Sequence, residues 1–471
     1  MNQSSFRLDY HDMQGLIVSG YAKLPCSAYL LLEITEAASA RRWLASMAEE
    51  ITTGGQQPKE VSINIAFTAH GLQRLGLPEA LGNNFSFAFR EGMAEPHRAR
   101  VLGDVDKNDS GGWEWEAGRD RIDILLLVYA ADFAELERQL DLIRIGCGES
   151  GIKAYRTLAA GRPQPRDNEP SSKEHFGFTD GLSQPLIDGD GPFQHVYEKT
   201  HRTSHETARV KPGEFILGYE DESKQIAGTA TLMVDGTTNW AADAAGFGWN
   251  GSYLVFRHLK QDVDAFNDFL AQSTLDSHGN PDPSAAELLG AKMIGRWKDG
   301  ASLVESATNQ RPKSNAFGYA REDPEGLKCP LGAHVRRANP RDCLDLKHPE
   351  DALERVQRRR LLRRGRSFGP RRDHSGPDED RGLYFICLCA DLERQFEFVQ
   401  QAWINSPSFA GLSGEIDPML GQPSATGCFT VPKEPVPSRV GGLKQFVTVR
   451  GGGYFFLPGV HALRMLAQRA Y

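Results

Sequence analysis

Short apolar runs rich in β-branched and aromatic residues alternate with amphipathic segments along the whole chain. Runs of this length predict strands, and apolar residues at three- and four-residue spacing predict helices. The predicted strands are 16–21, 27–33, 61–67, 122–129, 215–217, 252–259 and 382–388, and the predicted helices are 36–44, 132–145, 263–270 and 392–404. Because these elements lack the regular spacing of βαβ units, we expect an α+β fold with antiparallel sheets, each covered by helices on one face.

The size and charge of the chain narrow its class. Its 471 residues, of which 40% are apolar and 9% aromatic, suit a globular protein of two or three domains. The formal net charge is -8, which gives no overall electrostatic support for a nucleic-acid partner. We therefore expect small molecules rather than nucleic acid as partners.

The start of the chain and its cysteines predict a location. Residues 1–9 contain no charged region leading into an apolar run and no twin-arginine pair, so we expect no export signal. No apolar window reaches the length of a transmembrane helix. The seven cysteines are scattered and odd in number, which fits free thiols better than a disulfide framework. These features predict a cytoplasmic protein without a membrane segment.

One histidine lies in a small-residue turn beside a dense group of cations, within residues 332–341. A lone histidine in a loop is most often structural. Iron(III) haem, however, needs an axial nitrogen donor, and its two propionates need cationic partners. The pattern therefore favours His334 as a haem-iron ligand and Arg337, three residues later, as a propionate partner. Arg336 and Arg341 fit a solvated surface equally well.

A second segment far upstream, residues 175–185, holds Asp180 in a glycine-bracketed turn with the sequence Gly-Phe-Thr-Asp-Gly. Glycine permits close backbone approach and positive φ, so this carboxylate can project from the turn into a closed apolar space. An aspartate in such a place is otherwise the centre of an Asx-turn or a helix N-cap.

Together these two segments resemble the dye-decolourising peroxidase family, whose signature pairs a Gly-x-x-Asp-Gly turn with Gly-Ala-His-x-Arg-Arg. Further blocks similar to the family are 12–16, 215–219, 251–257, 295–297, 362–365 and 400–405, so the resemblance extends over nearly the whole chain. It implies a cytoplasmic, bacterial-type member with two ferredoxin-like domains in tandem, residues 1–210 and 211–471, the second of which holds one haem b. It also implies that hydrogen peroxide oxidises aromatic reductants and dyes through a ferryl haem.

The resemblance implies a division of labour around the haem. His334 would ligate the iron, Asp180 would move the peroxide proton, and Arg363 would stabilise the departing hydroxide. The ordinary role of an arginine in a basic run such as 358–366 is a surface salt bridge or a nucleic-acid contact, but we interpret this run as facing the haem. Gly365 stands where some bacterial members carry asparagine, so no amide is expected beside the peroxide.

The same resemblance supplies neighbours for the ligand and the haem. An acceptor on the second ring nitrogen of His334 would raise its basicity, and Asp417 is the predicted acceptor, with Glu415 as the alternative. An aspartate before proline is also a common turn former. Leu383 and Phe385 alternate along a predicted strand, so they would form an apolar roof over the haem or belong to the ordinary core.

Bulky dyes cannot enter a closed haem pocket, so the resemblance implies that they are oxidised at the surface by radicals on Trp or Tyr. The candidates, chosen on count alone, are Trp297, Tyr384, Trp403 and Tyr454.

Two rival functions stay open, namely release of iron from haem by a deferrochelatase-like enzyme and a haem carrier or sensor without turnover. A carrier needs His334 but has no use for Asp180 or Arg363, so all three together favour catalysis. The oligomeric state is left open, and a homo-oligomer is compatible with the sequence.

Overall fold

The computed structural model describes residues 7–117, 121–148, 150–161, 173–189, 209–227, 246–306, 315–372, 376, 379–422 and 427–468. The strands are β1 (Cys26–Ile34), β2 (Val61–Phe67), β3 (Trp115–Glu116), β4 (Ile124–Ala130), β5 (Ile152–Gly161), β6 (Leu186–Ile187), β7 (Arg209–Val210), β8 (Ser252–Gln261), β9 (Leu362–Arg363), β10 (Arg366–Phe368), β11 (Gly382–Cys389), β12 (Cys428–Val431), β13 (Ser438–Gly441) and β14 (Val447–Leu457).

The helices follow the same chain order. They are α1 (Gly15–Val18), α2 (Ala37–Glu50), α3 (Ala69–Arg74), α4 (Glu79–Gly82), α5 (Phe87–Glu91), α6 (Pro96–Leu102), α7 (Phe133–Gly148), α10 (Val263–Ser273), α11 (Pro283–Ile294), α12 (Tyr319–Glu322), α13 (His334–Ala338), α14 (Pro349–Gln357) and α15 (Val460–Gln468). The segments η5 (Leu392–Glu397) and η6 (Val399–Ile404) are π-helical. None of the helices in the described part of the chain is long and apolar enough to cross a membrane.

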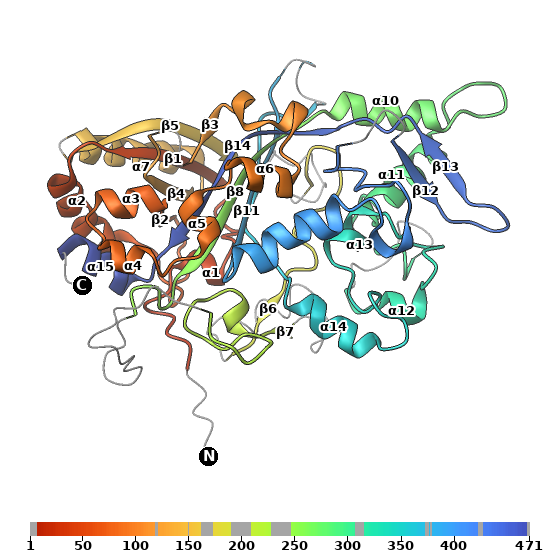
Figure 1. The fold of residues 1–471 in the computed structure, drawn as a ribbon. Coiled ribbons are helices and arrows are strands. Elements are labelled where there is room, and N and C mark those ends of the chain that lie inside the picture. The colour runs from red at the N-terminus through yellow and green to blue at the C-terminus, as the bar shows by residue number, and fades with distance from the viewer. Residues whose placement is uncertain are drawn as a thin grey trace.

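One large sheet joins the two ends of the chain. Its strand order is β10-β11-β8-β14-β2-β4-β1-β5, with β9 paired to β11 and β3 to β14. All its pairings are antiparallel except that of β3 with β14. The late strand β14 lies between β8 and the early strand β2, and α15 packs on α2 near the C-terminus (Figure 1). The predicted α+β class is confirmed.

The sheet curls so that its two ends meet. Strand β10 lies against β5, and the ring of Tyr29 on β1 is 5.6 Å from that of Phe256 on β8 and 5.8 Å from that of Tyr384 on β11. These rings and Tyr129 belong to one buried apolar core on the inner face of the sheet. Successive side chains of a strand face opposite ways, so the same strands present a second set of residues outward.

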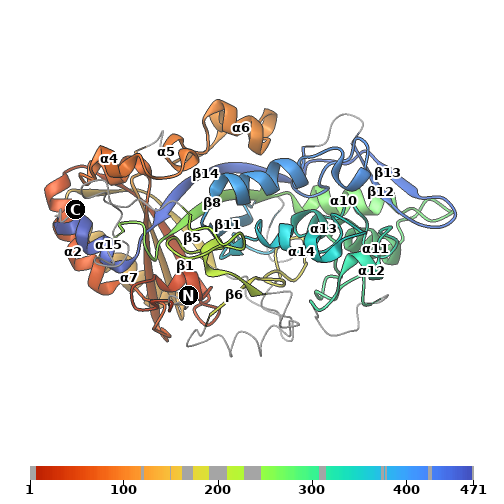
Figure 2. The same cartoon turned by 60° about the horizontal axis from the view of Figure 1, so that its bottom comes forward.

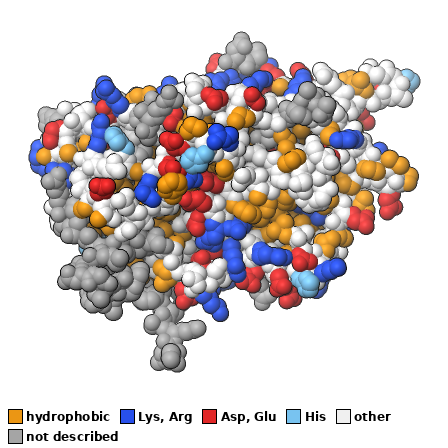
Figure 3. Space-filling model, in the orientation of Figure 1, with side chains coloured by type: hydrophobic (Ala, Val, Ile, Leu, Met, Phe, Trp, Pro, Cys, Tyr) orange, Lys and Arg blue, Asp and Glu red, His pale blue; other side chains and the backbone are white. Residues whose placement is uncertain are grey.

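Helices cover the outer face of the sheet. Apolar residues of α2, α7 and α15 pack on β1, β2 and β4, and apolar residues of α10 join a further core that includes Leu259 of β8. Figure 2 shows the large sheet running through the molecule, with α10 to α14 and the β12–β13 hairpin gathered at the end away from α2. On the face drawn in Figure 3, acidic and basic side chains are interspersed.

Two of the strands predicted from sequence are wrong. Residues 16–21 include part of the short helix α1, because their backbone groups bond to side chains instead of to a neighbouring strand. Arg364 donates to the carbonyls of Leu16 and Ile17, both at 2.7 Å, and Leu16 N–H donates to Asn64. Residues 215–217 are buried but form no strand; a turn follows them at Gly218, whose φ is +95°.

The sequence pattern of the other elements gives their position well. Strand β2 coincides with the predicted 61–67, and β1, β4, β8 and β11 lie within a few residues of their predictions. The predicted helices at 36–44, 132–145 and 263–270 correspond to α2, α7 and α10, and the predicted helix at 392–404 is helical but with π geometry.

His258 should make folding sensitive to acid. It is buried on β8, 4.9 Å from the rings of both Phe368 and Tyr384, and neither ring nitrogen has a hydrogen-bond partner among the described residues. Burial lowers the pKa of His258 to about 4. Between pH 6.5 and 4 the unfolded chain therefore binds more protons at this position, and stability falls as the pH falls.

We expect His258→Phe to reduce this loss, by on the order of 3 kcal/mol in the free energy of unfolding at pH 4 relative to pH 7. Urea unfolding of both proteins at the two pH values measures the difference. Equal pH dependence of wild type and variant would show that His258 is not buried in its neutral form.

Candidate active site

A cavity of about 310 Å³ lies on the outer face of the sheet, between its strands β8, β11 and β14 and the helical segments α13 and η6. Most of its wall is apolar. Strands contribute Leu259, Leu383, Phe385, Val447 and Val449, and the π-helical segments contribute Phe396, Val399 and Ile404. This volume is in the range of cofactor and ligand sites, and the few polar side chains within it are the candidates for chemistry.

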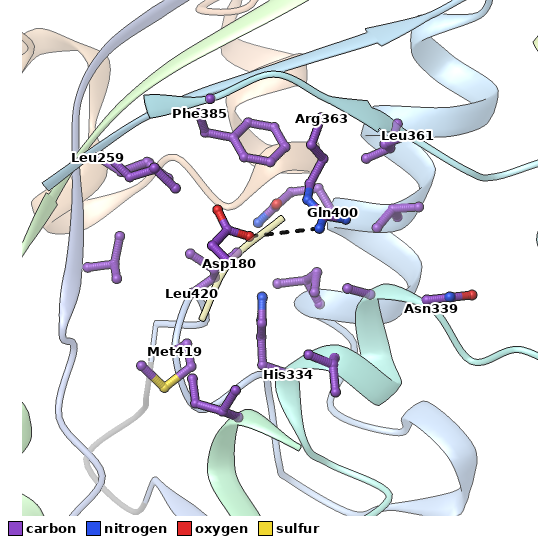
Figure 4. A pocket seen from close by; sticks show the side chains of 18 of the residues that line it. Asp180, Leu259, His334, Asn339, Leu361, Arg363, Phe385, Gln400, Met419 and Leu420 are labelled. Atoms are coloured by element: carbon purple, nitrogen blue, oxygen red, sulfur yellow. Dashed lines mark ion pairs between the residues drawn. The ribbon is translucent and has the colours of Figure 1, made fainter. Parts of the chain in front are cut away.

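His334 begins α13 and enters the cavity from one side (Figure 4). Its Nδ1 lies 2.9 Å from an Asp417 carboxylate oxygen, and the ring's other nitrogen points into the cavity. The second oxygen of Asp417 accepts the N–H groups of Met419 and Leu420 at 2.8 and 2.9 Å. Glu415 instead accepts from Thr430 at its backbone N–H. The structure thus brings Asp417, and not Glu415, to His334.

Charge dominates the protonation of this pair. Burial lowers the pKa of His334, but the Asp417 charge and hydrogen bond outweigh it, so the pKa lies above its ordinary value. Burial raises the pKa of Asp417, but His334, the Leu420 N–H and Arg337 outweigh it, so the pKa lies below its ordinary value. Asp417 is therefore an anionic acceptor that orients the imidazole and makes it more basic.

Asp180 and Arg363 lie in the cavity across from His334 (Figure 4). Asp180 follows Gly177 and precedes Gly181, which have φ values of +91° and +80°, and its carboxylate accepts the Gly181 N–H at 2.6 Å. The Arg363 guanidinium lies 3.8 Å from this carboxylate and donates to the Leu182 carbonyl at 3.0 Å. A proton acceptor and a cation therefore share the space opposite the imidazole.

Leu383 and Phe385 line the same cavity from β11, and the residues between and after them, Tyr384 and Ile386, belong to the inner core. In Figure 4 the Phe385 ring lies above Asp180 and next to Arg363. Both side chains thus contribute to the apolar wall of the cavity that also holds Asp180 and Arg363.

The prediction for Arg337 is contradicted by its hydrogen bonds. Its guanidinium is fully buried and does not line the cavity. It donates instead to main-chain carbonyls, at 2.6 Å to Trp403, 3.0 Å to Ser406 and 2.7 Å to Glu415. These donors are engaged, so Arg337 is placed to hold the loop that carries Asp417 and not to meet a propionate.

Besides Arg363, the cavity is lined by four arginines, Arg257, Arg296, Arg341 and Arg360. Of these four, sequence reasoning singled out only Arg341. Arg341 is buried, not solvated; it donates to the carbonyls of Asn315 and Phe317, both at 2.9 Å, and its guanidinium carbon is 3.9 Å from the centre of the Phe317 ring. Arg360 donates to the Ser183 carbonyl at 2.8 Å. The sequence signals for these two residues are weak: Arg341 lies close to His334 in the chain, and Arg360 belongs to the basic run 358–366. Arg336 is also buried, with its charge on Asp323.

A side-chain amide that sequence reasoning did not predict lines the cavity. No side chain fits at Gly365, because a Cβ there would lie 2.6 Å from the Tyr384 carbonyl oxygen. Gln400 of η6 lines the cavity instead, with its side chain beside Arg363 (Figure 4). The expectation that no amide lies beside Arg363 is therefore wrong. Gln400 of η6 supplies the amide that position 365, between β9 and β10, has no room for.

The four aromatic residues proposed for surface oxidation are not at the surface. Each is at most 8% exposed: Tyr454, Tyr384, Trp403 and Trp297. A bulky molecule cannot touch them, so they cannot act as the surface contact that was predicted.

Comparison with known proteins identifies the family. The DyP dimeric alpha+beta barrel domain matches residues 12–163, and the Dyp-type peroxidase C-terminal domain matches residues 215–434. The chain belongs to the dye-decolorizing, or DyP-type, peroxidase family. It is therefore a haem peroxidase, an oxidoreductase that uses hydrogen peroxide to oxidise dyes and other aromatic compounds.

Relatives and solved structures resemble the whole chain. Dye-decolorizing peroxidase msp1 of Mycetinis scorodonius is 27% identical over 98% of this chain and 88% of its own length. The multifunctional dye peroxidase DyP2 of Amycolatopsis is 28% identical, over 93% of this chain and 91% of its own length. The structure of an ancestral D-type dye decolorizing peroxidase has a TM-score of 0.78 at 28% identity, over 97% of this chain and 99% of the other. Since full-length relatives include fungal proteins, the likeness is not limited to bacterial-type members.

We expect Arg337→Leu to destabilise the fold, by about 3–5 kcal/mol, because it leaves several buried carbonyls without donors and removes a buried charge near Asp417. Arg355→Leu is the control, since its side chain is 54% exposed and, among the described residues, forms an ion pair with Asp345. Urea unfolding measures both. Equal, small effects of the two substitutions would contradict the structural role of Arg337.

Proposed function

We propose that this chain performs its peroxidase reaction in the cavity between His334 and the Asp180–Arg363 pair. The observation that carries the proposal is the arrangement itself: a carboxylate-bound imidazole faces a carboxylate and a guanidinium across an apolar space. A base and a cation opposite a metal-binding imidazole are the groups that peroxide cleavage needs.

The residues around the cavity fit haem b. His334 would hold the iron through the nitrogen that points into the cavity, while Asp417 fixes the ring through the other. Arg341 and Arg360 are the proposed partners of the propionates in place of Arg337, because their side chains line the cavity. When bound, the haem supplies the redox chemistry; the protein supplies the axial nitrogen, the charges and the apolar wall.

Asp180 is the proposed proton carrier. Its side chain is 47% exposed, and its described partners are one backbone N–H and the distant guanidinium, so part of the carboxylate is free to accept a proton. It would take a proton from the inner oxygen of peroxide and return it to the outer oxygen. Arg363, held by the Leu182 carbonyl, would stabilise the negative charge that develops as the O–O bond breaks.

A rival function is release of iron from haem. The deferrochelatase of Yersinia pestis is 34% identical, but over 52% of this chain and 42% of its own length. The full-length likeness to dye peroxidases, together with Asp180 and Arg363 in the cavity, favours peroxide chemistry over both iron release and simple haem transport.

Several further features belong to the same proposal. We propose hydrogen peroxide and aromatic reductants as the partners, a boundary near residue 210 between two ferredoxin-like domains, and a cytoplasmic location. The two family matches on either side of residue 210 support the boundary, and the seven free cysteines support a reducing compartment.

We expect His334→Ala to bind haem weakly or not at all, because no other imidazole lines the cavity within the described residues. Haem titration, followed by the Soret band, measures the affinity. Asp417→Asn is the matched comparison: it keeps the ligand and should keep haem. A His334→Ala protein with the haem content and resting spectrum of wild type would exclude His334 as the ligand.

We expect Arg363→Leu to retain haem and to react with peroxide roughly a hundred- to a thousand-fold more slowly, equivalent to about 3–4 kcal/mol of lost charge stabilisation. Stopped-flow spectroscopy with peroxide alone measures this step without a reductant. Arg355→Leu, which removes an exposed arginine that pairs with Asp345 and does not line the cavity, is the control. A loss below about fivefold for Arg363→Leu would place the needed cation elsewhere.

A further inference from the structure

Glu174 lines the same cavity, and its carboxylate closes the loop that carries Asp180. One oxygen accepts the Phe178 N–H at 2.8 Å, and the other accepts the Phe176 N–H at 2.9 Å and the Gln261 amide at 2.6 Å. Main-chain bonds tighten the same loop, from Gly177 N–H to the Glu174 carbonyl and from Glu174 N–H to the Phe178 carbonyl. The side chain thus accepts two N–H groups of its own turn and one amide from β8.

This loop is held from its far side as well. The Phe176 and Phe178 rings pack on Phe266 of α10, at 4.7 and 6.4 Å between ring centres. Thr179 donates to the Lys298 carbonyl through both its N–H, at 3.1 Å, and its hydroxyl, at 3.0 Å. Each anchor lies before residue 180.

The Asp180 carboxylate makes few direct contacts. Among the described residues it accepts only the Gly181 N–H, and the Arg363 guanidinium is 3.8 Å away. Its place in the cavity therefore depends on the main chain on both sides of it. After Asp180, Arg363 and Arg360 hold the Leu182 and Ser183 carbonyls, and before it the chain follows the 174–178 loop that Glu174 closes.

We propose that Glu174 is a positioning residue for the reaction with peroxide, which keeps Asp180 directed at Arg363 by closing the 174–178 loop. The proposal rests on the proton-carrying role of Asp180 proposed above. A displacement of the order of 1 Å in a proton acceptor is enough to slow proton transfer on the order of tenfold to a hundredfold.

Gln261 of β8 supports this assignment. Its amide nitrogen donates to Glu174, and its amide oxygen is buried with no hydrogen-bond partner among the described residues. This orientation is the one that an ionised carboxylate requires. Burial raises the pKa of Glu174 to about 6, and the Asp180 charge adds to the rise, so the carboxylate is ionised above neutral pH.

The orphaned oxygen also makes Glu174→Gln an informative substitution. A glutamine keeps the shape and one acceptor, and its new N–H₂ group can donate to the Gln261 oxygen after that amide turns over. The Phe176 N–H loses its acceptor, so the loop is loosened while the fold is retained. Lys173→Gln, which changes a charge on the adjacent residue, is the matched control.

The test is a double-substitution cycle at pH 7.5 on the haem-loaded enzyme, with stopped-flow rates for peroxide alone. We expect Glu174→Gln to be slower than wild type by tenfold to a hundredfold, on the order expected for a misplaced proton acceptor, and Lys173→Gln to match wild type. In the Asp180→Asn background, Glu174→Gln should change the rate by no more than about twofold, because it acts through Asp180. In the apo-protein, amide hydrogen exchange of residues 174–178 should be faster in Glu174→Gln than in wild type, and Lys173→Gln should match wild type.

A wild-type rate for Glu174→Gln, or a loss that multiplies fully onto that of Asp180→Asn, overturns the positioning role and leaves the proton role of Asp180 standing. A wild-type rate for Asp180→Asn overturns the role of Asp180 itself, and the proposal for Glu174 fails with it. Unchanged exchange of residues 174–178 in Glu174→Gln shows that the carboxylate does not hold the loop.

Discussion

The alternation of side chains along β8 and β11 is the constraint on which the rest of the structure depends. On β8, Phe256 points into the closed core, whereas Arg257 and Leu259 line the cavity; on β11, Tyr384 and Phe385 divide in the same way. A shift of either strand by one residue would exchange the two faces, removing the apolar wall of the cavity and placing polar groups in the core. The contacts that close the sheet therefore also determine the shape of the site.

Buried arginines of the sheet and of α13 bind segments that have no regular strand pairing. Arg364 binds the carbonyls of the N-terminal turn, and Arg337 binds those of the loop that bears Asp417. A guanidinium offers five donors in a fixed plane, so one side chain can satisfy several carbonyls that a strand would otherwise pair. The adjacent residue Arg363 is directed into the cavity because Arg364 is held on the other side. Structural and reactive cations thus alternate within one short segment.

Much of the site could be recognised because its key residues lie in two continuous motifs. His334 and Asp180 each sit in a short turn whose glycines and neighbours are adjacent in sequence, and the structure brings both to one cavity. The role of Arg337 does not follow from the sequence, because its partners are main-chain carbonyls, which every residue has and no side-chain pattern reveals. The sequence does not point to Gln400, because this residue belongs to a different element from Gly365, which stands at the position of the asparagine of some family members.

The sequence by itself determined the α+β class, the position of most strands and helices, and the local turns that expose Asp180 and His334, since these depend on periodicity and on glycine within a few residues. Only the tertiary structure decided which acidic residue meets His334, which arginines face the cavity and which aromatic residues are buried. Those outcomes depend on contacts such as Arg364 with Leu16, which join positions hundreds of residues apart. These contacts form only when the sheet closes. Each charged side chain then either stays in solvent, binds buried carbonyls or faces the cavity, because a charge cannot be buried without a partner.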